Sequence, residues 1–321
     1  MNAALFYVYF NSIQIIKSCA KVFGDEDGTI KRECCMNKLF KASLLYFFFI
    51  LIQIHAATRD CRNGYELTLG DDFVMNFCEI PAANNIKVGS EYGYKNESPV
   101  VLRNFSKVFF MGQFEVTQRQ YKAIMKSEPW KNADGTLKSG VKVGDNYPAV
   151  YIGLFEMQEF LKRIGELDDS AIYRLPTEAE WEFAARSSSN TNFYWGPHFN
   201  KDFVFYAGNS FGFAEHAREV TSCPNKFIDY NFPGYCGNFY GLMHMSGNVW
   251  ERTIDVYDGA SDYSKVSKDG HEIVTGEGIG TVIRGGGWRD SSYQSRVSNR
   301  LGSPEDLDGP DMGFRVLRMP K

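Results

Sequence analysis

The sequence has no strong excess of charge of either sign. Its 35 Lys and Arg residues nearly balance 39 Asp and Glu residues, for a formal net charge of −4. A protein that binds nucleic acid needs a basic surface, so this balance argues against a nucleic-acid partner. Histidine is scarce, with five residues and no HxxxH or HExxH spacing. The chain also lacks a P-loop and a dinucleotide-binding glycine pattern, and this argues against the enzyme classes that depend on them.

One apolar run stands out near the amino end. Residues 38–57 read KLFKASLLYFFFILIQIHAA, with a basic start and small residues at the end. This order is typical of a cleaved secretory signal, and the apolar part is short for a membrane span. We expect residues 1–35 to be an upstream extension that need not be translated, and residues 36–57 to be a signal peptide. The protein would be exported, periplasmic or secreted, without a stable membrane span; an uncleaved anchor is the alternative.

Cleavage after residue 57 would leave an even number of cysteines. The four that remain of seven are Cys61, Cys78, Cys223 and Cys236. In an oxidising compartment these indicate disulfides, and the local pairs are Cys61 with Cys78 and Cys223 with Cys236. Three connectivities are possible in principle, and free thiols are the other alternative. Each loop closure would stabilise the fold by roughly 3 kcal/mol.

Local patterns predict a loop-rich fold, with an N-terminal entry segment at 58–102 ahead of the main domain. Thr117 with Gln120 and Thr177 with Glu180 form capping boxes, which predict helices to about residue 126 and over 178–186. Apolar spacing predicts a third helix over 155–164. Strands are expected at 66–69, 73–75, 107–115, 281–283 and 312–317, and loops at 82–98 and 187–240. An ion-pair network is expected among Arg174, Glu178, Glu180, Glu182 and Arg186.

The stretch 241–255, GLMHMSGNVWERTID, combines turn-forming and apolar residues most densely. Gly247 and Asn248 tolerate positive φ, so a tight turn there carries little strain. Glu251 directly follows Trp250 in an apolar context. A lone buried carboxylate costs several kcal/mol, so Glu251 is expected to pair with an arginine or with a cation.

Several blocks of the chain together resemble the sulfatase-modifying-factor family, whose founding activity is the formylglycine-generating enzyme. In chain order the blocks are residues 114–121, 173–186, 241–255, 284–288 and 312–315. The resemblance covers residues 103–317 and implies a sulfatase-modifying-factor-like domain at 103–318. It implies an α+β fold of the formylglycine-generating-enzyme-like, C-type-lectin-related class, with little regular secondary structure.

The family commonly carries two structural calcium ions, and the resemblance implies oxygen ligands for both. The first site would use the side chain of Asn209 and the carbonyl of Ser210. The second would use the carbonyls of Gly247 and Val249 and the carboxylate of Glu251. Calcium prefers such oxygen ligands. The chain departs from the family at His244, which stands where Asn or Asp is usual.

The copper site of the family's oxidase is missing from the sequence. That enzyme holds Cu(I) through a pair of cysteines, because thiolates are soft ligands. The equivalent stretch, residues 288–300, contains no cysteine. Copper is therefore not expected, and whether the protein is an enzyme stays open. In this fold the stretch would instead contribute to a peptide-binding groove with the aromatic and arginine side chains that dominate hot spots, namely Trp288, Arg289, Tyr293, Arg296 and Arg300.

These observations lead to one expected function and two alternatives. We expect an exported member of the family that is not an oxidase and binds a peptide, protein or cell-envelope ligand through residues 288–300. The enzymatic alternative is a divergent metal-dependent oxidase that acts on a peptide or a secondary metabolite. The third is a structural part of an envelope or secretion assembly.

Overall fold

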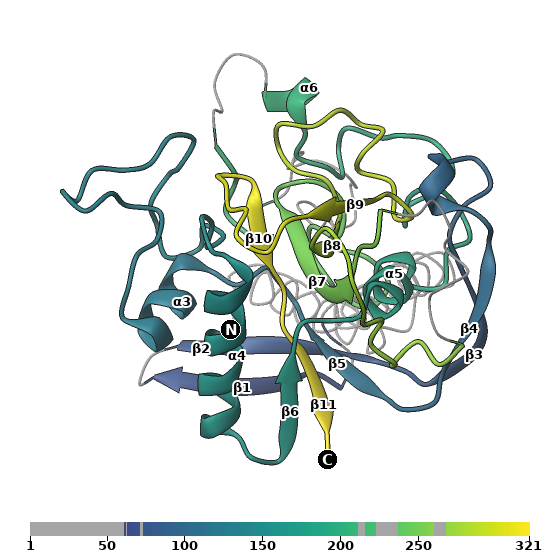
Figure 1. The fold of residues 1–321 in the computed structure, drawn as a ribbon, viewed down its shortest axis with the longest axis horizontal. Coiled ribbons are helices and arrows are strands. Elements are labelled where there is room, and N and C mark those ends of the chain that lie inside the picture. Colours follow the sequence, from purple (N-terminus) through teal and green to yellow (C-terminus); the bar gives the residue numbers. More distant parts are fainter. Residues whose placement is uncertain (1–60, 62, 71–72, 211–215, 223–236, 260–267) are drawn as a thin grey trace, which may run out of the picture. The chain divides into compact units, whose positions relative to one another are not determined.

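A five-stranded antiparallel sheet forms the base of the domain in the computed structural model (Figure 1). The strand order is β1 (Tyr65–Gly70), β2 (Phe73–Ile80), β5 (Phe109–Gly112), β11 (Leu317–Pro320) and β6 (Ala171–Arg174). The first and last strands of the described residues therefore belong to one sheet. The structure describes residues 61, 63–70, 73–210, 216–222, 237–259 and 268–321.

A second sheet and a hairpin build the remainder of the domain. The second sheet has the order β10 (Met312–Phe314), β7 (Trp250–Val256), β8 (Thr281–Arg284) and β9 (Arg300–Ser303). Strand β10 pairs with β7 in parallel, and the other two pairings are antiparallel. The hairpin joins β3 (Ala83–Val88) to β4 (Val101–Phe105), with the short helix η1 (Lys95–Glu97) between them.

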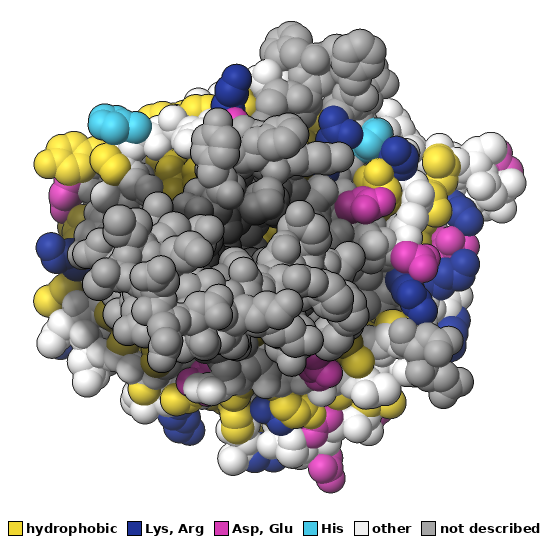
Figure 2. Space-filling view, turned by 180° about the vertical axis from the view of Figure 1, so that it is seen from behind, with side chains coloured by type: hydrophobic (Ala, Val, Ile, Leu, Met, Phe, Trp, Pro, Cys, Tyr) yellow, Lys and Arg dark blue, Asp and Glu magenta, His cyan; other side chains and the backbone are white. Residues whose placement is uncertain are grey.

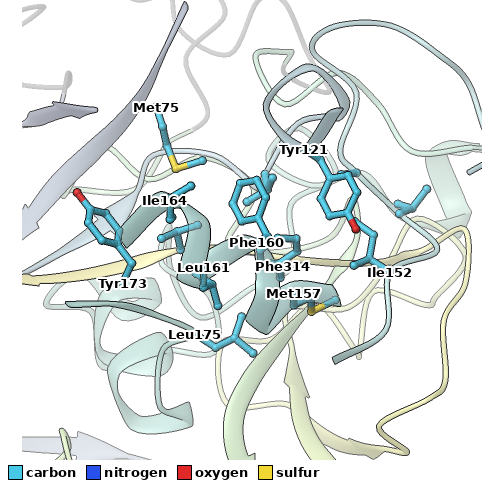
Figure 3. Close-up of a cluster of buried hydrophobic side chains, with 14 of the residues drawn as sticks. Met75, Tyr121, Ile152, Met157, Phe160, Leu161, Ile164, Tyr173, Leu175 and Phe314 are labelled. Carbon is cyan, nitrogen blue, oxygen red and sulfur yellow. The ribbon is translucent and has the colours of Figure 1, made fainter. Parts of the chain in front are cut away.

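Two apolar cores lie on opposite faces of the base sheet. Helices α3 (Gln118–Met125) and α4 (Leu154–Leu167) cover the first core, in which Phe160 of α4 stacks on Tyr121 of α3 (Figure 3). Helix α5 (Glu178–Arg186) belongs to the second core. Side chains alternate along β2, so Phe77 joins the first core and Cys78 the second.

The helices expected from capping boxes are confirmed. The Thr117 hydroxyl accepts from the Gln120 amide at 3.2 Å, and the Thr177 hydroxyl accepts from the Glu180 amide at 3.0 Å. Helix α4 extends the predicted 155–164 by a few residues. The four-residue helix α6 (Ala207–Ser210) lies in the segment expected to be irregular.

Three expectations about strands and boundaries differ from the structure. The segment expected as a loop at 82–98 contains β3, because its polar residues pair with β4 across the hairpin. The single strand expected at 312–317 is two strands, β10 and β11, which enter different sheets. The expected boundary at residue 103 falls inside β4, and β1 and β2 form part of the base sheet, so residues 65–102 belong to the domain.

Only part of the expected disulfides and export signal lies within the described residues. Cys61 and Cys78 form a disulfide with a Cα–Cα distance of 4.5 Å. Cys223, Cys236 and residues 1–57 lie outside the described residues. In the described part of the chain, none of the helices is both long and apolar enough to span a bilayer. On the face in Figure 2, basic side chains are interspersed with acidic ones.

The two capping threonines provide a matched pair for a stability measurement. The Thr177 hydroxyl also donates to the buried carbonyl of Gly270 at 2.6 Å. Loss of an N-cap costs about 0.5–2 kcal/mol, and an orphaned buried acceptor adds about 1 kcal/mol. We therefore expect Thr177→Ala to lower the free energy of unfolding more than Thr117→Ala in urea denaturation. Equal losses would contradict the second bond of Thr177.

Candidate functional site

The carboxylate of Glu251 lies in a fully buried ion pair with Arg315. The Arg315 Nη2 donates to Glu251 Oε1 at 2.6 Å, and Nε donates to Oε2 at 2.9 Å. The indole Nε1 of Trp181 donates to the same Oε2 at 2.7 Å. Of the two partners expected for Glu251, the structure contains the arginine.

Arg315 also fixes the backbone where the chain passes from one sheet to the other. Its Nη1 donates to the carbonyls of Gly112 and Gln113, both at 2.8 Å, and its Nη2 donates to the carbonyl of Met243 at 2.7 Å. Burial disfavours the charged guanidinium, but Glu251 outweighs this and raises the pKa of Arg315. The guanidinium is therefore a permanent buried cation.

The second calcium site does not fit the side chains present. Both oxygens of Glu251 already accept from Arg315, whose positive charge would repel a calcium ion at the same carboxylate. His244 lies buried beside this pair, and burial and the charge of Arg315 lower its pKa to about 3. A neutral imidazole offers nitrogen, which calcium does not favour. Of the first site, only the backbone of Asn209 and Ser210 in α6 is described.

A second buried carboxylate, that of Glu115, lies close to the same guanidinium. Its Oε1 accepts from the side-chain amide of Asn248 at 3.0 Å. Burial raises the pKa of Glu115 to about 8, although Arg315 opposes this rise. Within the described residues, no group of three or more His, Cys, Asp or Glu side chains could hold a metal ion.

The ion-pair network expected around α5 is present and reaches further than the sequence indicated. Arg174 pairs with Glu180 at 2.6 Å, and Arg186 pairs with Glu182 at 2.7 Å. Glu180 also contacts the imidazole of His271, and Glu182 also pairs with Arg284. These charged side chains therefore form ion pairs inside the fold and stabilise it.

Two arginines expected to bind a ligand are buried in the same kind of pair. Arg296 is 3% exposed and donates to both oxygens of Glu97, at 2.6 and 2.7 Å. Arg300 is 5% exposed and donates to both oxygens of Glu178, at 2.7 and 2.8 Å. Their burial argues against the expected contact with a ligand, because each guanidinium neutralises a buried glutamate.

Trp288 is also part of the interior rather than of a binding surface. It is 8% exposed, belongs to the first core, and its Nε1 donates to the carbonyl of Pro310 at 3.2 Å. Of the five expected contact residues, Arg289 and Tyr293 are exposed. The Arg289 side chain is 55% exposed and lies 4.0 Å from Asp311.

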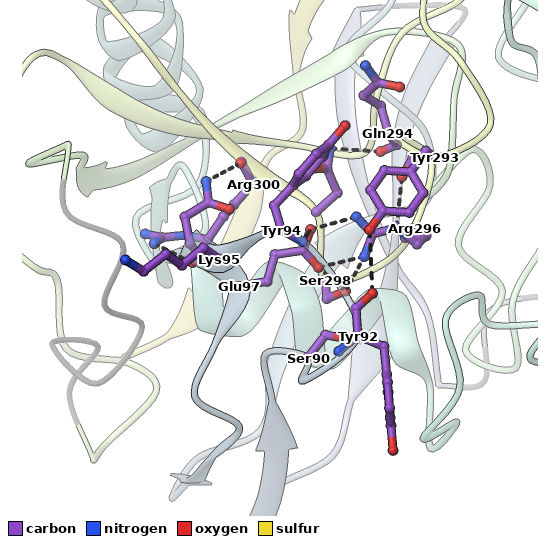
Figure 4. Close-up of polar contacts among 12 residues, drawn as sticks. Ser90, Tyr92, Tyr94, Lys95, Glu97, Tyr293, Gln294, Arg296, Ser298 and Arg300 are labelled. Carbon is purple, nitrogen blue, oxygen red and sulfur yellow. Dashed lines mark hydrogen bonds and ion pairs between the residues drawn. The ribbon is translucent and has the colours of Figure 1, made fainter.

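Tyr293 belongs to an exposed tyrosine cluster that the sequence analysis missed. We define the tyrosine cluster as Tyr92, Tyr94 and Tyr293; the ring of Tyr92 points away from the other two rings (Figure 4). Tyr94 packs edge-on against Tyr293 with ring centroids 4.8 Å apart, and the Tyr293 hydroxyl donates to the Tyr92 carbonyl at 3.4 Å. Tyr92 is 87% exposed. The only local sign was an EYGY run in a polar segment assigned to a loop.

The buried ion pair of Arg296 and Glu97 packs against the tyrosine cluster. The guanidinium of Arg296 lies 3.8 Å from the centre of the Tyr293 ring. Gly93 lies against the Glu97 carboxylate, where a Cβ would clash with Oε2. The buried ion pair of Arg296 and Glu97 therefore packs directly against the tyrosine cluster and positions it.

Comparison with known proteins is consistent with this architecture. The profile of the sulfatase-modifying factor enzyme 1-like domain matches residues 79–320. The Bos taurus protein named inactive C-alpha-formylglycine-generating enzyme 2 is 27% identical over 190 residues, 58% of this chain and 54% of its own, so the match spans about half of that protein. The chaperone protein LppX of Paenibacillus barcinonensis is 26% identical over 306 residues, 85% of this chain and 98% of its own. The structure of PvdO from Pseudomonas aeruginosa has the same fold, with a TM-score of 0.63, 22% identity, and coverage of 79% of this chain and 98% of its own.

We expect Glu251→Gln to lower the free energy of unfolding by about 3–5 kcal/mol, because it leaves Arg315 buried without its counterion. The same substitution at Glu159 is the control, since that carboxylate forms an exposed pair with Arg163 and should cost below about 1 kcal/mol. Urea denaturation with and without a calcium chelator measures both. A chelator effect present in the wild type and absent in Glu251→Gln would place a cation on this carboxylate.

Asp255 gives the fold a pH dependence. Burial and the nearby charge of Glu178 raise its pKa from 3.8 to about 7, while its oxygens accept from the amides of Glu178 and Val274 at 2.7 and 2.8 Å. The folded state binds the Asp255 proton more tightly than the unfolded state, so this proton stabilises the fold at low pH. The stabilisation is lost as the pH rises from 3.8 through about 7. We expect unfolding free energy to fall with rising pH less steeply in Asp255→Asn than in the wild type. Parallel pH profiles would contradict this.

Proposed function

The chain belongs to the sulfatase-modifying factor enzyme 1-like domain family, and we propose that it is an exported member that binds a peptide, protein or cell-envelope ligand without acting as an oxidase. The observation that carries the proposal is the composition of the 288–300 stretch. It contains no cysteine, and its arginines at 296 and 300 neutralise buried glutamates. Cu(I) therefore lacks its soft ligands there.

The tyrosine cluster and Arg289 are the proposed contact surface. Tyrosine offers a large amphipathic ring at a low entropic cost, which is why it is enriched in binding hot spots. The ring of Tyr92 is almost fully exposed, while its backbone amide donates to the Ser90 hydroxyl at 3.1 Å. A rigid backbone that presents an exposed ring loses little freedom on binding a partner.

The names of two relatives support the absence of oxidase activity, and the amino-terminal sequence supports export. One relative is named as an inactive enzyme and another as a chaperone, which fits a member that binds without oxidising. Export rests on the signal-like run at 38–57. A disulfide between Cys61 and Cys78 suits an oxidising compartment.

Selection from a phage-displayed library of random linear peptides tests the proposal. We expect clones selected on the wild type to bind Tyr92→Ala or Arg289→Ala about tenfold or more weakly, as for other hot-spot residues, with an unchanged melting temperature. The matched controls are Phe155→Ala and Lys162→Ala, an exposed aromatic residue and an exposed cation on α4. Equal losses in the controls would refute the proposed surface, and one copper or iron per chain with turnover would favour the oxidase alternative.

A further inference from the structure

A cavity of about 480 Å³ lies beside the disulfide, where β1 and β2 pair at the margin of the base sheet. Binding pockets for small molecules usually enclose about 300–1,000 Å³, so this one can hold a small ligand. The cavity shares no residue with the tyrosine cluster. Its wall includes Cys61, Tyr65, Glu66, Asn76, Phe77 and Gln113.

Two polar side chains of the wall are direct cross-strand neighbours. Glu66 of β1 is paired in register with Asn76 of β2. Partners in such a pair have Cβ atoms about 4.5–5.5 Å apart on the same face of the sheet. The carboxylate and the amide therefore project together toward the cavity side.

Asn76 is unusual for its place in the strand. Residues 76, 78 and 80 share one face of β2, and Cys78 and Ile80 are fully buried in the second core. Asn76 continues this row where an apolar residue would extend the core. Its Oδ1 is buried and has no hydrogen-bond partner among the described residues, which costs about 1–3 kcal/mol. A polar residue kept at such a cost indicates a use other than packing.

The third polar side chain is held in place by the buried network. The backbone amide of Gln113 donates to the carbonyl of Asn76 at 2.8 Å, and its own carbonyl accepts from Arg315 at 2.8 Å. Its side-chain Nε2 donates to the carbonyl of Gly241 at 3.4 Å. With the disulfide on the other side, the wall is preformed.

We propose that this cavity binds a small molecule that carries a primary ammonium group. The site goes beyond the proposed function and does not depend on it. An ammonium group has three donors and no acceptor. The wall offers it the carboxylate of Glu66 and the amide oxygens of Asn76 and Gln113, and no Lys, Arg or His occurs among the described residues of this wall. The disulfide borders the cavity, whereas the rings of Tyr65 and Phe77 point to the opposite face of the sheet and join the first core.

Hexylamine, which is an ammonium ion at neutral pH, is the probe, and 1-hexanol and hexanoate are its neutral and negative counterparts. Titration of the full chain is followed by the amide signals in NMR spectra. We expect hexylammonium to shift the signals of Glu66, Asn76 and Gln113 and to bind more tightly than hexanol or hexanoate. Absence of binding, equal binding of hexanol, or shifts confined to other residues would each overturn the proposal.

Matched variants test which groups recognise the ammonium ion. Loss of a charged hydrogen-bond partner should weaken hexylammonium about threefold to tenfold in Glu66→Gln and Asn76→Leu. Glu79→Gln is the control, because Glu79 lies on β2 outside the cavity wall and its carboxylate accepts from Asn63. Gln113→Glu should tighten hexylammonium, a gain that misfolding cannot produce. Unchanged affinity in Glu66→Gln or weaker binding in Gln113→Glu would overturn the proposal.

Discussion

The buried pair of Arg315 and Glu251 holds the two sheets of this domain together. Glu251 lies on β7 of the second sheet, and Arg315 lies in the two-residue gap between β10 and β11, where the chain crosses to the base sheet. The guanidinium binds three backbone carbonyls as well as the carboxylate. Removing one partner would leave an uncompensated charge in the interior, so the crossing point tolerates no other side-chain chemistry easily.

The same solution recurs through the domain and decides which residues remain for function. Glu97, Glu178, Glu180 and Glu182 are each buried against an arginine. Such pairs replace apolar packing in a domain with few helices and many irregular segments, and they favour one arrangement because each fork of donors fits one carboxylate. An arginine in this sequence is therefore a poor indicator of a binding surface unless its glutamate partner is excluded.

The extent of correct prediction follows the range of the interactions. Thr177 with Glu180 forms a capping box within four residues, so local sequence predicted α5 well. The strand β3 and the division of 312–317 depend on partners far along the chain, and no local pattern reports them. Similarly, the sequence does not reveal that Arg296 pairs with Glu97, because the two residues lie 199 positions apart in the chain. Without that partner, Arg296 is expected to contact a ligand. The family resemblance carried the fold, while the contact surface needed the structure.

The separation between a charged interior and an exposed surface explains how this fold can change its chemistry. Arg296 and Arg300 hold the backbone of the 288–300 stretch through Glu97 and Glu178, whatever side chains stand at the exposed positions between them and Trp288. Side chains at those positions can therefore differ without loss of either buried pair. Side chains such as Tyr293 project outward from that backbone, and the fold by itself does not decide what such residues bind.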